Sequence, residues 1–520
     1  MTETTEHAIA TPHVDASRTG AEVLASGGNA IDAALAAAAV LTVAYPHNCA
    51  LGGDLFALVR RPDGGVLSVN ASGPAGAGVD ARALRAAVGA TMPVTGPHTV
   101  TVPGMVAGWG ALHGLGASRP WHRHLERATE LAAEGVAVAD GLADAISESP
   151  GVRADPGMAA VFTRAGTPLR ADELVRQPAL ACTLGRLAAD GPRAFYDGEL
   201  ADTLAAGLAR AGCAVTAADL RAYDPVVEPP LRRSFAGVEV LTSAPNSSGV
   251  LLLQALAALE ALAPADPLGA DAGQLASILR SGSAQRDRML ADPAFVAFDR
   301  EQWLGERRIE ELVTEARHGL TDPEVPLSGT RPDGDTVAVV TVDADGGAVS
   351  LIQSLYHSFG AQILEPVTGV LFHNRGASFS LDPGHPNALG PRRRPAHTLM
   401  PVMARREERL LGVLGTMGGR VQAQIHVQVL LRLLEGATPQ DAVDAPRWVV
   451  GALEAGEQDG TVRIEEGVES DAQRALRVPG LTPLSVPRGS DDVGHAQAIW
   501  TEREPAAGSD ARADGMAICG

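Results

Sequence analysis

The hydrophobic positions near the start of the chain follow a helical spacing. From Asp15 to about Ala44, apolar residues recur every three or four positions, and Gly27-Gly28 interrupts the pattern. Asn29 follows the break, and its side chain can accept a hydrogen bond from an unpaired N–H group of a first helical turn. The pattern therefore predicts one helix with Asp15 as its cap, and a second, Ala-rich helix that is buried.

Other segments have the patterns of strands. Residues 50–70 predict a hairpin with its turn at 62–65, where the letters are PDGG. Residues 331–360 predict a second hairpin, whose first strand is apolar at nearly every position from Val337 to Val342. A strand of that kind is usually covered on both faces. We therefore expect more than one layer of sheet.

A third strand leads into a long amphipathic helix. Residues 410–415 read LLGVLG, a buried strand, and a turn at 416–419 connects them to a helix that ends at Gly436. The middle of the chain, 115–325, alternates helical patterns with Pro- and Gly-containing loops. No linker separates independent domains, and the elements together predict stacked sheets with outer layers of helices.

Composition excludes several classes of protein. The chain has 520 residues, 45% of them hydrophobic and 20% charged, enough to bury a sizeable core. The net charge of −20 argues against nucleic acid or an anionic membrane as the main partner. No apolar run reaches the roughly 18 residues of a membrane span, and the first residues lack the pattern of a secretory signal. We expect a protein without a membrane segment.

Cysteine usage points to a compartment. Cys49, Cys182, Cys213 and Cys519 are far apart and form no CxxC pair, so they predict neither a disulfide framework nor a zinc site. The 14 histidines have no metal-ligand spacing. We therefore expect a reducing cytoplasm, and neither a metal nor another cofactor.

Familiar catalytic motifs are absent, but one glycine turn is a candidate site. The patterns GxSxG, GxxxxGK[ST] and HExxH do not occur. Gly418 and Gly419 stand between the strand at 410–415 and the following helix, where two backbone N–H groups could bind an oxyanion. The alternative is a tight connection without a ligand. A dinucleotide site is disfavoured because the glycine spacing there is GxxGxxG.

Thr336 is the second candidate, because it lies where a polar turn meets a buried strand. If the chain were cut before it, Thr336 would carry a hydroxyl group and a free α-amine with a pKa of about 7.7–8.0. Such an amine can take the hydroxyl proton near neutral pH without a histidine. The alternative is an ordinary threonine that opens a strand.

Ordered blocks along nearly the whole chain resemble the γ-glutamyltransferase (γ-glutamyl transpeptidase) family of N-terminal-nucleophile hydrolases. The blocks include SGGNAIDAALAAAAVLTVAYPHNCALGGDLFALV, VTVPGMVAGWGALHGLG, PNSSGVLLLQALAALE, QRDRMLADP, GDTVAVVTVDADGGAVSLIQSLYHSFG, FHNRGASFSLDPGHPNALGPRRRPAHTLMP, GTMGG, DAPRW and GSDARADG. So many blocks in order make the resemblance specific. The blocks around GDT and NRGASFSLDPGHPNAL indicate a divergent branch.

This resemblance implies a fold, a maturation step and a reaction. The expected fold is a four-layer αββα sandwich, and the expected cut lies between Asp335 and Thr336, giving subunits 1–335 and 336–520. Thr336 would attack an amide and form an acyl-enzyme. Water or an amine acceptor would then take the acyl group. Ser354 falls where a hydroxyl group orients the nucleophile. Gly418 and Gly419 fall on the oxyanion pair, and a homo-oligomer is possible.

The expected substrate-binding positions depart from the family pattern. Asn70 or Pro74 stands where an arginine would bind the substrate α-carboxylate, and Ser378 stands where an aspartate would bind the α-ammonium group. Further positions expected at this site are Tyr356, Asn374, Arg375, His397, Thr398 and Arg420. Each missing charge-assisted hydrogen bond is worth about 1.5–3 kcal/mol. Arg375 and Arg420 could instead bind an acid that has no amino group.

Three functions follow from these residues. The first is a γ-glutamyltransferase-like amidohydrolase or acyltransferase. The second is an amidohydrolase whose acyl group is a simpler carboxylic acid. The third, disfavoured because Thr336, Ser354 and the glycine pair are retained, is an unprocessed relative that serves as a binding protein.

Overall fold

The computed structural model describes residues 6–318, 335–452 and 458–520. It begins with strand β1 (Ala8–Thr11) and helices α1 (Val14–Ala25) and α2 (Ala30–Ala44). Asn29 caps α2: its side chain accepts from Asp32 N at 3.0 Å, and Asp32 accepts from Asn29 N at 2.9 Å. Both helices are confirmed and α2 is buried throughout, but His13 and not Asp15 caps the first helix.

The first of two large sheets is built around the segment that opens with Thr336. Its seven strands are antiparallel to their neighbours and follow the order β22-β1-β11-β12-β2-β3-β8. Their bounds are Met516–Cys519 for β22, Asp335–Val342 for β11, Ala348–Tyr356 for β12, Asp54–Arg60 for β2, Val66–Ala71 for β3 and Val226–Glu228 for β8. Both expected hairpins, β2–β3 and β11–β12, are confirmed and lie in this sheet.

The second large sheet contains the strand before the glycine turn. Its six strands follow the order β21-β20-β16-β15-β10-β9. They are β21 (Ala506–Ser509), β20 (His495–Trp500), β16 (Arg409–Met417), β15 (Val402–Arg406), β10 (Val238–Thr242) and β9 (Leu231–Phe235). The helix expected after the turn is α16 (Gln422–Leu434).

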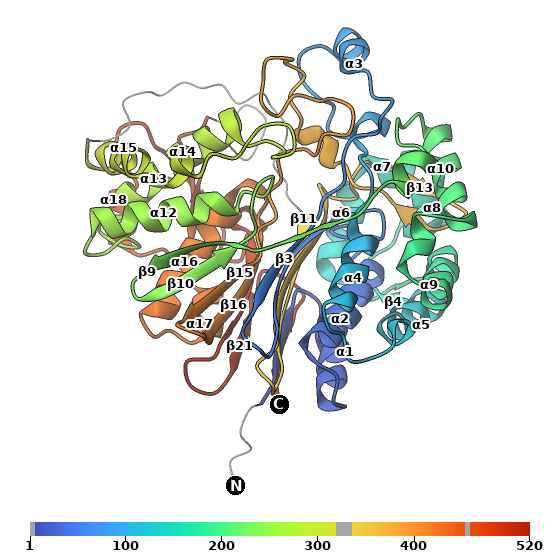
Figure 1. Ribbon diagram of the computed structural model, residues 1–520, viewed down its shortest axis with the longest axis horizontal. Helices are drawn as coiled ribbons and strands as arrows, with labels where there is room; N and C mark the ends of the chain where they lie inside the picture. Colours follow the sequence, from blue (N-terminus) through green and yellow to red (C-terminus); the bar gives the residue numbers. More distant parts are fainter. Residues whose placement is uncertain (1–5, 319–334, 453–457) are drawn as a thin grey trace.

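The two sheets pack face to face, as Figure 1 shows. Val340 of β11, Met403 of β15 and Val413 of β16 share one buried cluster between them. The sheets approach closely at Gly415, where an added Cβ would lie 2.7 Å from Ala338 Cβ. A larger residue at Gly415 would push the sheets apart, so the strand needs glycine at this position.

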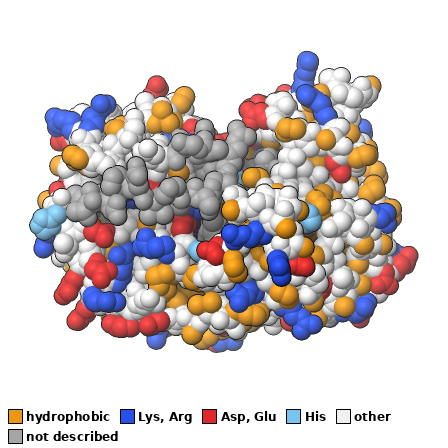
Figure 2. Space-filling model, turned by 90° about the horizontal axis from the view of Figure 1, so that it is seen from above, with side chains coloured by type: hydrophobic (Ala, Val, Ile, Leu, Met, Phe, Trp, Pro, Cys, Tyr) orange, Lys and Arg blue, Asp and Glu red, His pale blue; other side chains and the backbone are white. Residues whose placement is uncertain are grey.

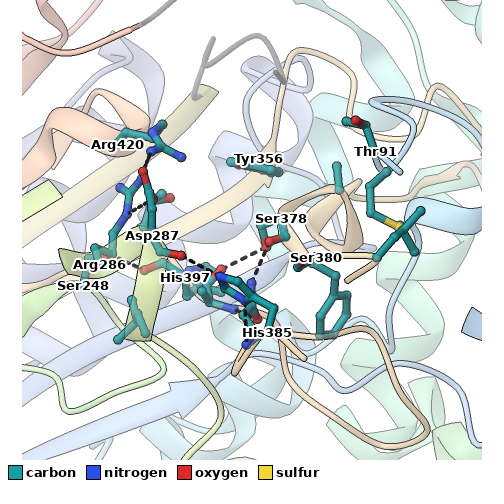
Figure 3. Close-up of a pocket in the computed structure, with 18 of the residues that line it drawn as sticks. Thr91, Ser248, Arg286, Asp287, Tyr356, Ser378, Ser380, His385, His397 and Arg420 are labelled. Carbon is teal, nitrogen blue, oxygen red and sulfur yellow. Dashed lines mark hydrogen bonds and ion pairs between the residues drawn. The ribbon is translucent and has the colours of Figure 1, made fainter. Parts of the chain in front are cut away.

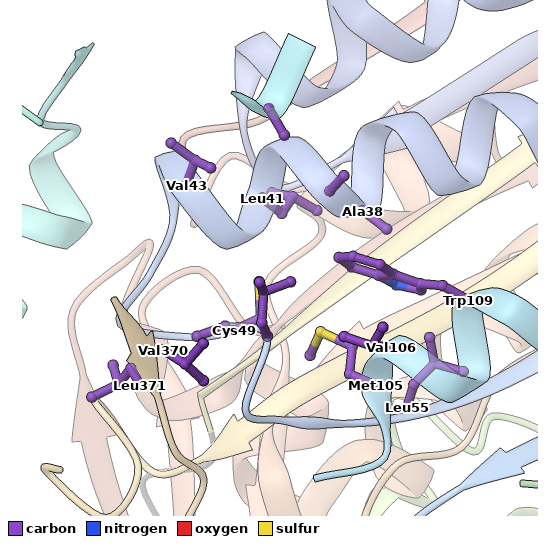
Figure 4. Packing of buried hydrophobic residues seen from close by; sticks show 14 of the residues in the cluster. Ala38, Leu41, Val43, Cys49, Leu55, Met105, Val106, Trp109, Val370 and Leu371 are labelled. Carbon is purple, nitrogen blue, oxygen red and sulfur yellow. The ribbon is translucent and has the colours of Figure 1, made fainter. Parts of the chain in front are cut away.

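Helices cover the outer face of each sheet (Figure 1). On the first sheet these are α1, α2, α4 (Met105–Gly114), α5 (Glu126–Glu134), α9 (Pro178–Asp190) and α10 (Glu199–Ala211). On the second they are α12 (Gly249–Leu262), α13 (Ala272–Met289), α15 (Glu306–His318) and α16. Figure 4 shows Trp109 of α4 packed between α2 and the sheet, where its Nε1 donates to Gln353 Oε1 at 3.1 Å.

Shorter elements complete the molecule. The helices are α3 (Ala81–Val88), α6 (Asp140–Glu148), α7 (Pro150–Ala154), α8 (Pro156–Phe162), α11 (Ala217–Arg221), α14 (Arg300–Leu304), α17 (Pro439–Asp444) and α18 (Ser470–Ala475). The strands include β17 (Trp448–Val450), β18 (Thr461–Glu465) and β19 (Thr482–Val486), which form a small sheet of their own.

The segments before and after residue 336 are intertwined. Strands β11 and β12 lie between β1 and β2 in the first sheet, and β9 and β10 from the earlier segment join the second sheet. The division into 1–335 and 336–520 stays a prediction, and the polar turn before Asp335 falls outside the described residues. In the part of the chain that is described, no helix combines the length and the apolar character needed to cross a membrane.

Candidate active site

Three polar side chains form a row across the centre of the first sheet. In the strand register Thr336 of β11 pairs with Ser354 of β12, and Ser354 pairs with Asp54 of β2. Directly paired residues have their side chains on the same face of a sheet. Thr336 Oγ1 donates to Ser354 Oγ at 3.1 Å, and the same Ser354 oxygen accepts from Tyr356 N at 2.8 Å. All three side chains of the row are buried, beside a register shift between Asp335 and Thr336.

Asp54 is the centre of a buried group of charged and polar side chains, which we name the site network: Asp54, His373, Arg375 and His397. Asp54 Oδ2 accepts from His397 Nε2 at 2.7 Å and from Arg375 Nε at 3.0 Å, and it lies 3.3 Å from His373 Nδ1. Asp54 Oδ1 is buried and has no hydrogen-bond partner within residues 6–318, 335–452 and 458–520. The network thus joins Asp54 to residues that lie more than 300 positions later in the chain.

Electrostatics assign the charges within the site network. Burial alone would raise the pKa of the Asp54 carboxyl group, but Arg375 and the histidines hold that pKa well below its usual value. Burial, with the charge of Arg375, lowers the pKa of His397 to about 4, although Asp54 opposes the shift. Near neutral pH, Asp54 and Arg375 therefore form the ion pair, and His397 is neutral.

Arg375 lies behind the ring of Tyr356. Its guanidinium carbon is 4.1 Å from the ring centroid, a cation–π contact, and its Nη1 donates to Thr398 Oγ1 at 3.2 Å. Its Nη2 is buried, and in the described part of the chain it has no hydrogen-bond partner. Tyr356 adopts a φ of 83°, which bulky side chains rarely do, so the surrounding contacts hold this ring in place.

The glycine turn lies at the same end of the sandwich as Thr336. Ser350 Oγ of β12 donates to Leu414 O of β16 at 2.6 Å, and a Cβ on Gly415 would lie 2.8 Å from Ile352 Cδ1. The two strands therefore advance in the same direction, and Ser354 and the turn after Met417 lie at one end. Gly418 and Gly419 have φ values of 148° and 51°, followed by α16. Turns of this kind can hold an oxyanion with backbone N–H groups.

A cavity of about 160 Å³ opens beside these residues (Figure 3). Tyr356, Ser378, His397, Thr398 and Arg420 contribute to its lining. Thr336 is not among the lining residues, and its side chain is 1% exposed while it remains joined to Asp335. The cavity therefore borders the site network at His397 and does not reach Thr336.

Two arginines and one aspartate lie together on one side of the cavity. Asp287 Oδ1 accepts from Arg286 Nη2 at 2.8 Å and from Arg286 Nε at 3.1 Å, and Asp287 Oδ2 accepts from Arg420 Nη2. Burial opposes ionisation of Asp287, but Arg286 and Arg420 lower its pKa. Burial, together with the charge of Arg420, lowers the pKa of Arg286. We name Arg286, Asp287 and Arg420 the arginine pair site.

Comparison with known proteins decides the family. Residues 16–520 match the family described as Gamma-glutamyltranspeptidase. This chain belongs to the gamma-glutamyltranspeptidase family. Membership confirms the predicted enzyme class, a self-processing amidohydrolase of this family.

The similarity to individual relatives covers nearly the whole chain. The chain is 35% identical to an oxamate amidohydrolase proenzyme of Klebsiella pneumoniae over 94% of this chain and 93% of that protein. It is 34% identical to a glutathione hydrolase-like proenzyme of Bacillus subtilis, over 99% and 98%. The structure of a cephalosporin acylase from Bacillus halodurans superposes with a TM-score of 0.89 at 31% identity, covering 99% of this chain and 96% of that one. This likeness confirms the four-layer fold.

The remaining predicted positions lie in different surroundings. Ser378 lines the cavity, and its Oγ donates to Arg375 O and Ala396 O, each at 2.9 Å. Asn374 is buried away from it: Nδ2 donates to Val94 O at 2.7 Å and Oδ1 accepts from His357 N at 3.1 Å. Asn374 therefore holds the loop that carries Arg375. In the described part of the chain, no group of three or more His, Cys, Asp or Glu side chains could hold a metal ion.

Sequence analysis missed Asp54, Arg286 and Asp287. Asp54 is the one charged residue in LGGDLFALV, and a charge in an otherwise apolar strand was a signal that it has a buried partner. Arg286 and Asp287 lie in QRDRMLADP, a block matched only as part of the resemblance. Their proximity to Arg420, more than 130 residues later, carries no local signal.

Proposed function

We propose that Thr336 becomes the N-terminal nucleophile of this gamma-glutamyltranspeptidase family member. The observation that carries the proposal is the 3.1 Å hydrogen bond from Thr336 Oγ1 to Ser354 Oγ at the start of β11. Ser354 Oγ is itself held by Tyr356 N at 2.8 Å, so it fixes the direction of the Thr336 hydroxyl group. A nucleophile next to an orienting partner is the arrangement that covalent catalysis needs.

Maturation would be the first use of this hydroxyl group. Thr336 Oγ1 attacks the carbonyl carbon of Asp335, the C–N bond breaks, and an ester joins Asp335 to the Thr336 oxygen. Water then hydrolyses the ester. Asp335 keeps a new carboxylate, and Thr336 keeps its hydroxyl group and a free α-amine, which gives fragments 1–335 and 336–520.

Turnover would use the amine released by that step. The α-amine takes the proton of Oγ1, which attacks the substrate amide carbon, and the Gly418 and Gly419 N–H groups bind the oxyanion. The leaving amine takes a proton as the C–N bond breaks, and an acyl-threonine remains. Water, or an amine in the transfer reaction, releases the acyl group.

The substrate we propose is a small carboxylic amide whose acyl group carries an anionic group and no ammonium group. Arg286 and Arg420 line the cavity, with Arg375 behind its wall. Among the described lining residues, Asp287 is the one carboxylate, and both of its oxygens accept from arginines. An ammonium group would find no unoccupied carboxylate there. In support, one relative is named for oxamate, an amide with a carboxylate and no amino group.

We also infer a cytoplasmic location, because Cys49, Cys182, Cys213 and Cys519 are all unpaired, as in proteins of reducing compartments.

Intact-mass spectrometry of purified protein tests the nucleophile. We expect two fragments that meet between Asp335 and Thr336. Thr336→Ala should stay uncut and inactive, while Thr336→Ser, which keeps a hydroxyl group, should cleave slowly. A wild-type chain that cleaves amides while intact, or that cuts elsewhere, would contradict the proposal. An uncut and inactive wild-type protein would favour the binding-protein alternative.

A substrate panel tests the acyl group. Oxamate, malonamate, succinamate and glutaramate should be cleaved, whereas γ-glutamyl anilide, which carries an α-ammonium group, should be a poor substrate. Uncharged amides of the same length serve as controls. Preference for the γ-glutamyl compound would contradict this proposal and favour a γ-glutamyl group as the acyl group.

A further inference from the structure

The arginine pair site has the features of a built anion site. Asp287 uses both oxygens to hold two guanidinium groups, so the three side chains carry a net charge of +1 (Figure 3). Arg286 is 94% buried, and its Nη1 has no hydrogen-bond partner among the residues that the structure describes. A buried cationic donor without an acceptor is costly unless a ligand supplies one. The pKa of Arg286 is lowered because burial and the charge of Arg420 both disfavour its protonated form.

We propose that Arg286 and Arg420, held in place by Asp287, form the subsite that binds the free carboxylate of the substrate's acyl group. This inference rests on the proposed function. Arginine suits the task because its planar fork of N–H groups matches the two oxygens of a carboxylate. Asp287 acts as a positioning residue, because its Oδ1 accepts from Nε and Nη2 of Arg286, a residue that lines the cavity, and leaves Nη1 unused.

The place of the subsite fixes the kind of substrate. Arg420 directly follows Gly419, the proposed oxyanion donor, and the cavity joins it to Tyr356 and Thr398. An acyl group that places its amide carbonyl at the glycine turn can therefore extend its far end toward Arg420. The substrate class that fits is a monoamide of a short dicarboxylic acid.

Arg375 is the rival for this role, and the geometry disfavours it. Its side chain is 1% exposed, it does not line the cavity, and the Tyr356 ring covers one face of its guanidinium group. Its charge is already paired with Asp54 at 3.0 Å. Arg286 and Arg420 together carry two positive charges against the one negative charge of Asp287, and both residues line the cavity.

Calorimetric titration of purified, processed protein with the corresponding dicarboxylates tests the inference, because product binding needs no turnover. The probes are oxalate, malonate, succinate and glutarate, with butyrate as the comparator that lacks the second carboxylate. We expect one of the dicarboxylates to bind wild-type protein more tightly than butyrate. Arg420→Gln should weaken that dicarboxylate by about tenfold or more and leave butyrate unchanged.

Two further variants complete the design. Arg392→Gln removes an exposed arginine outside the cavity and should bind like wild type. Arg420→Lys keeps a cation next to Asp287 but loses the fork of donors, so it should weaken the dicarboxylate more than butyrate. This variant decides the question if Arg420→Gln does not fold.

Each result has one meaning. Equal dicarboxylate binding by wild type and Arg420→Gln, equal losses for dicarboxylate and butyrate, or no dicarboxylate binding by wild type would overturn the subsite. Amide cleavage that persists beside any of these results would leave the proposed function standing. Dicarboxylate binding that depends on Arg420, in a protein that cleaves no amide, would contradict the proposed function alone.

Discussion

Two buried ion networks of this molecule differ in how completely their polar atoms are used. In the site network, Asp54 Oδ1 and Arg375 Nη2 have no hydrogen-bond partner among the described residues, and His397 borders the cavity. The other, which we name the scaffold network, consists of Arg447, Glu465, Asp510 and Arg512, none of which lines the cavity. The contrast separates a network whose carboxylate oxygens all have partners from one that keeps unpaired polar atoms and borders the cavity through His397.

The scaffold network ties the small sheet to the second large sheet. Asp510 Oδ1 accepts from Arg512 Nη1 at 2.8 Å, and Asp510 Oδ2 accepts from Arg447 Nη2 and from Ala496 N at the start of β20. Glu465 of β18 accepts from Arg512 Nε at 3.1 Å. Every carboxylate oxygen of the scaffold network has a partner. As far as the structure describes the chain, Arg447 Nη1 is the one buried side-chain nitrogen of Arg447 and Arg512 without a partner. Such completeness rigidifies a fold.

Removing the charge at the centre of the scaffold network should have the largest effect. We expect Asp510→Asn to lower the free energy of unfolding by about 3–5 kcal/mol, because two buried arginines lose their shared partner. Urea denaturation measures the loss, and kcat/KM of the fraction that remains folded should match wild type. A folded Asp510→Asn protein with an altered substrate preference would remove the distinction between the networks.

Acid should weaken both regions through two buried histidines: His397 of the site network, and His495, which lies close enough to Asp510, Arg447 and Arg512 for their charges to affect its pKa. The pKa values of His397 and His495 are lowered to about 4, in both cases first by burial, from an ordinary value of 6.5. Because the unfolded chain binds these protons at higher pH than the fold does, each histidine contributes stability that is complete above pH 6.5. That stability is lost as the pH falls toward 4, by up to about 3 kcal/mol for each histidine.

Urea denaturation at pH 7.5, 6.0 and 5.0 checks this dependence. Wild-type protein should lose stability steadily on acidification, and His495→Asn should lose less over the same range. Equal stability at pH 7.5 and pH 5.0 would contradict the assignment of these histidines as neutral in the fold.

An aspartate-to-asparagine substitution in the site network should affect substrate binding and turnover. We expect Asp54→Asn to lower kcat/KM of the folded protein about 10- to 100-fold, because Arg375 and His397 lose the carboxylate that orients them. Stability should also fall, since one buried arginine is left unpaired. Steady-state kinetics with a dicarboxylic acid monoamide and with an uncharged amide of the same length measures kcat/KM, and urea denaturation measures the loss of stability. An unchanged kcat/KM would show that Asp54 contributes to stability alone, as the scaffold network does.

Ser354→Ala should give the smallest change of this series. The variant removes the neutral hydrogen bond to Thr336, worth about 0.5–1.5 kcal/mol, and also the acceptor of Tyr356 N, so we expect kcat to fall by about tenfold. The rate of self-cleavage should fall with it. Complete loss of cleavage would show that Ser354 does more than orient the hydroxyl group.

Local features of the fold were predictable, and the long-range ones were not. The Asn29 cap of α2 and the apolar run from Val337 to Val342 are signals within a few residues, and both appear in the structure as predicted. The partners of Asp54 lie more than 300 residues away along the chain, so only folding brings them together. Thr336 and the glycine turn gained weight from the resemblance of many ordered blocks and not from their own local pattern.

The central claim, that Thr336 carries the acyl group, is tested most directly by stopping turnover with acid and mapping the adduct by peptide mass spectrometry. The account predicts a peptide that begins with Thr336 and is heavier by the mass of the acyl group, in wild-type protein given a monoamide of a dicarboxylic acid. An acyl group on any other residue, or turnover by chains in which Thr336 is still joined to Asp335, would contradict it.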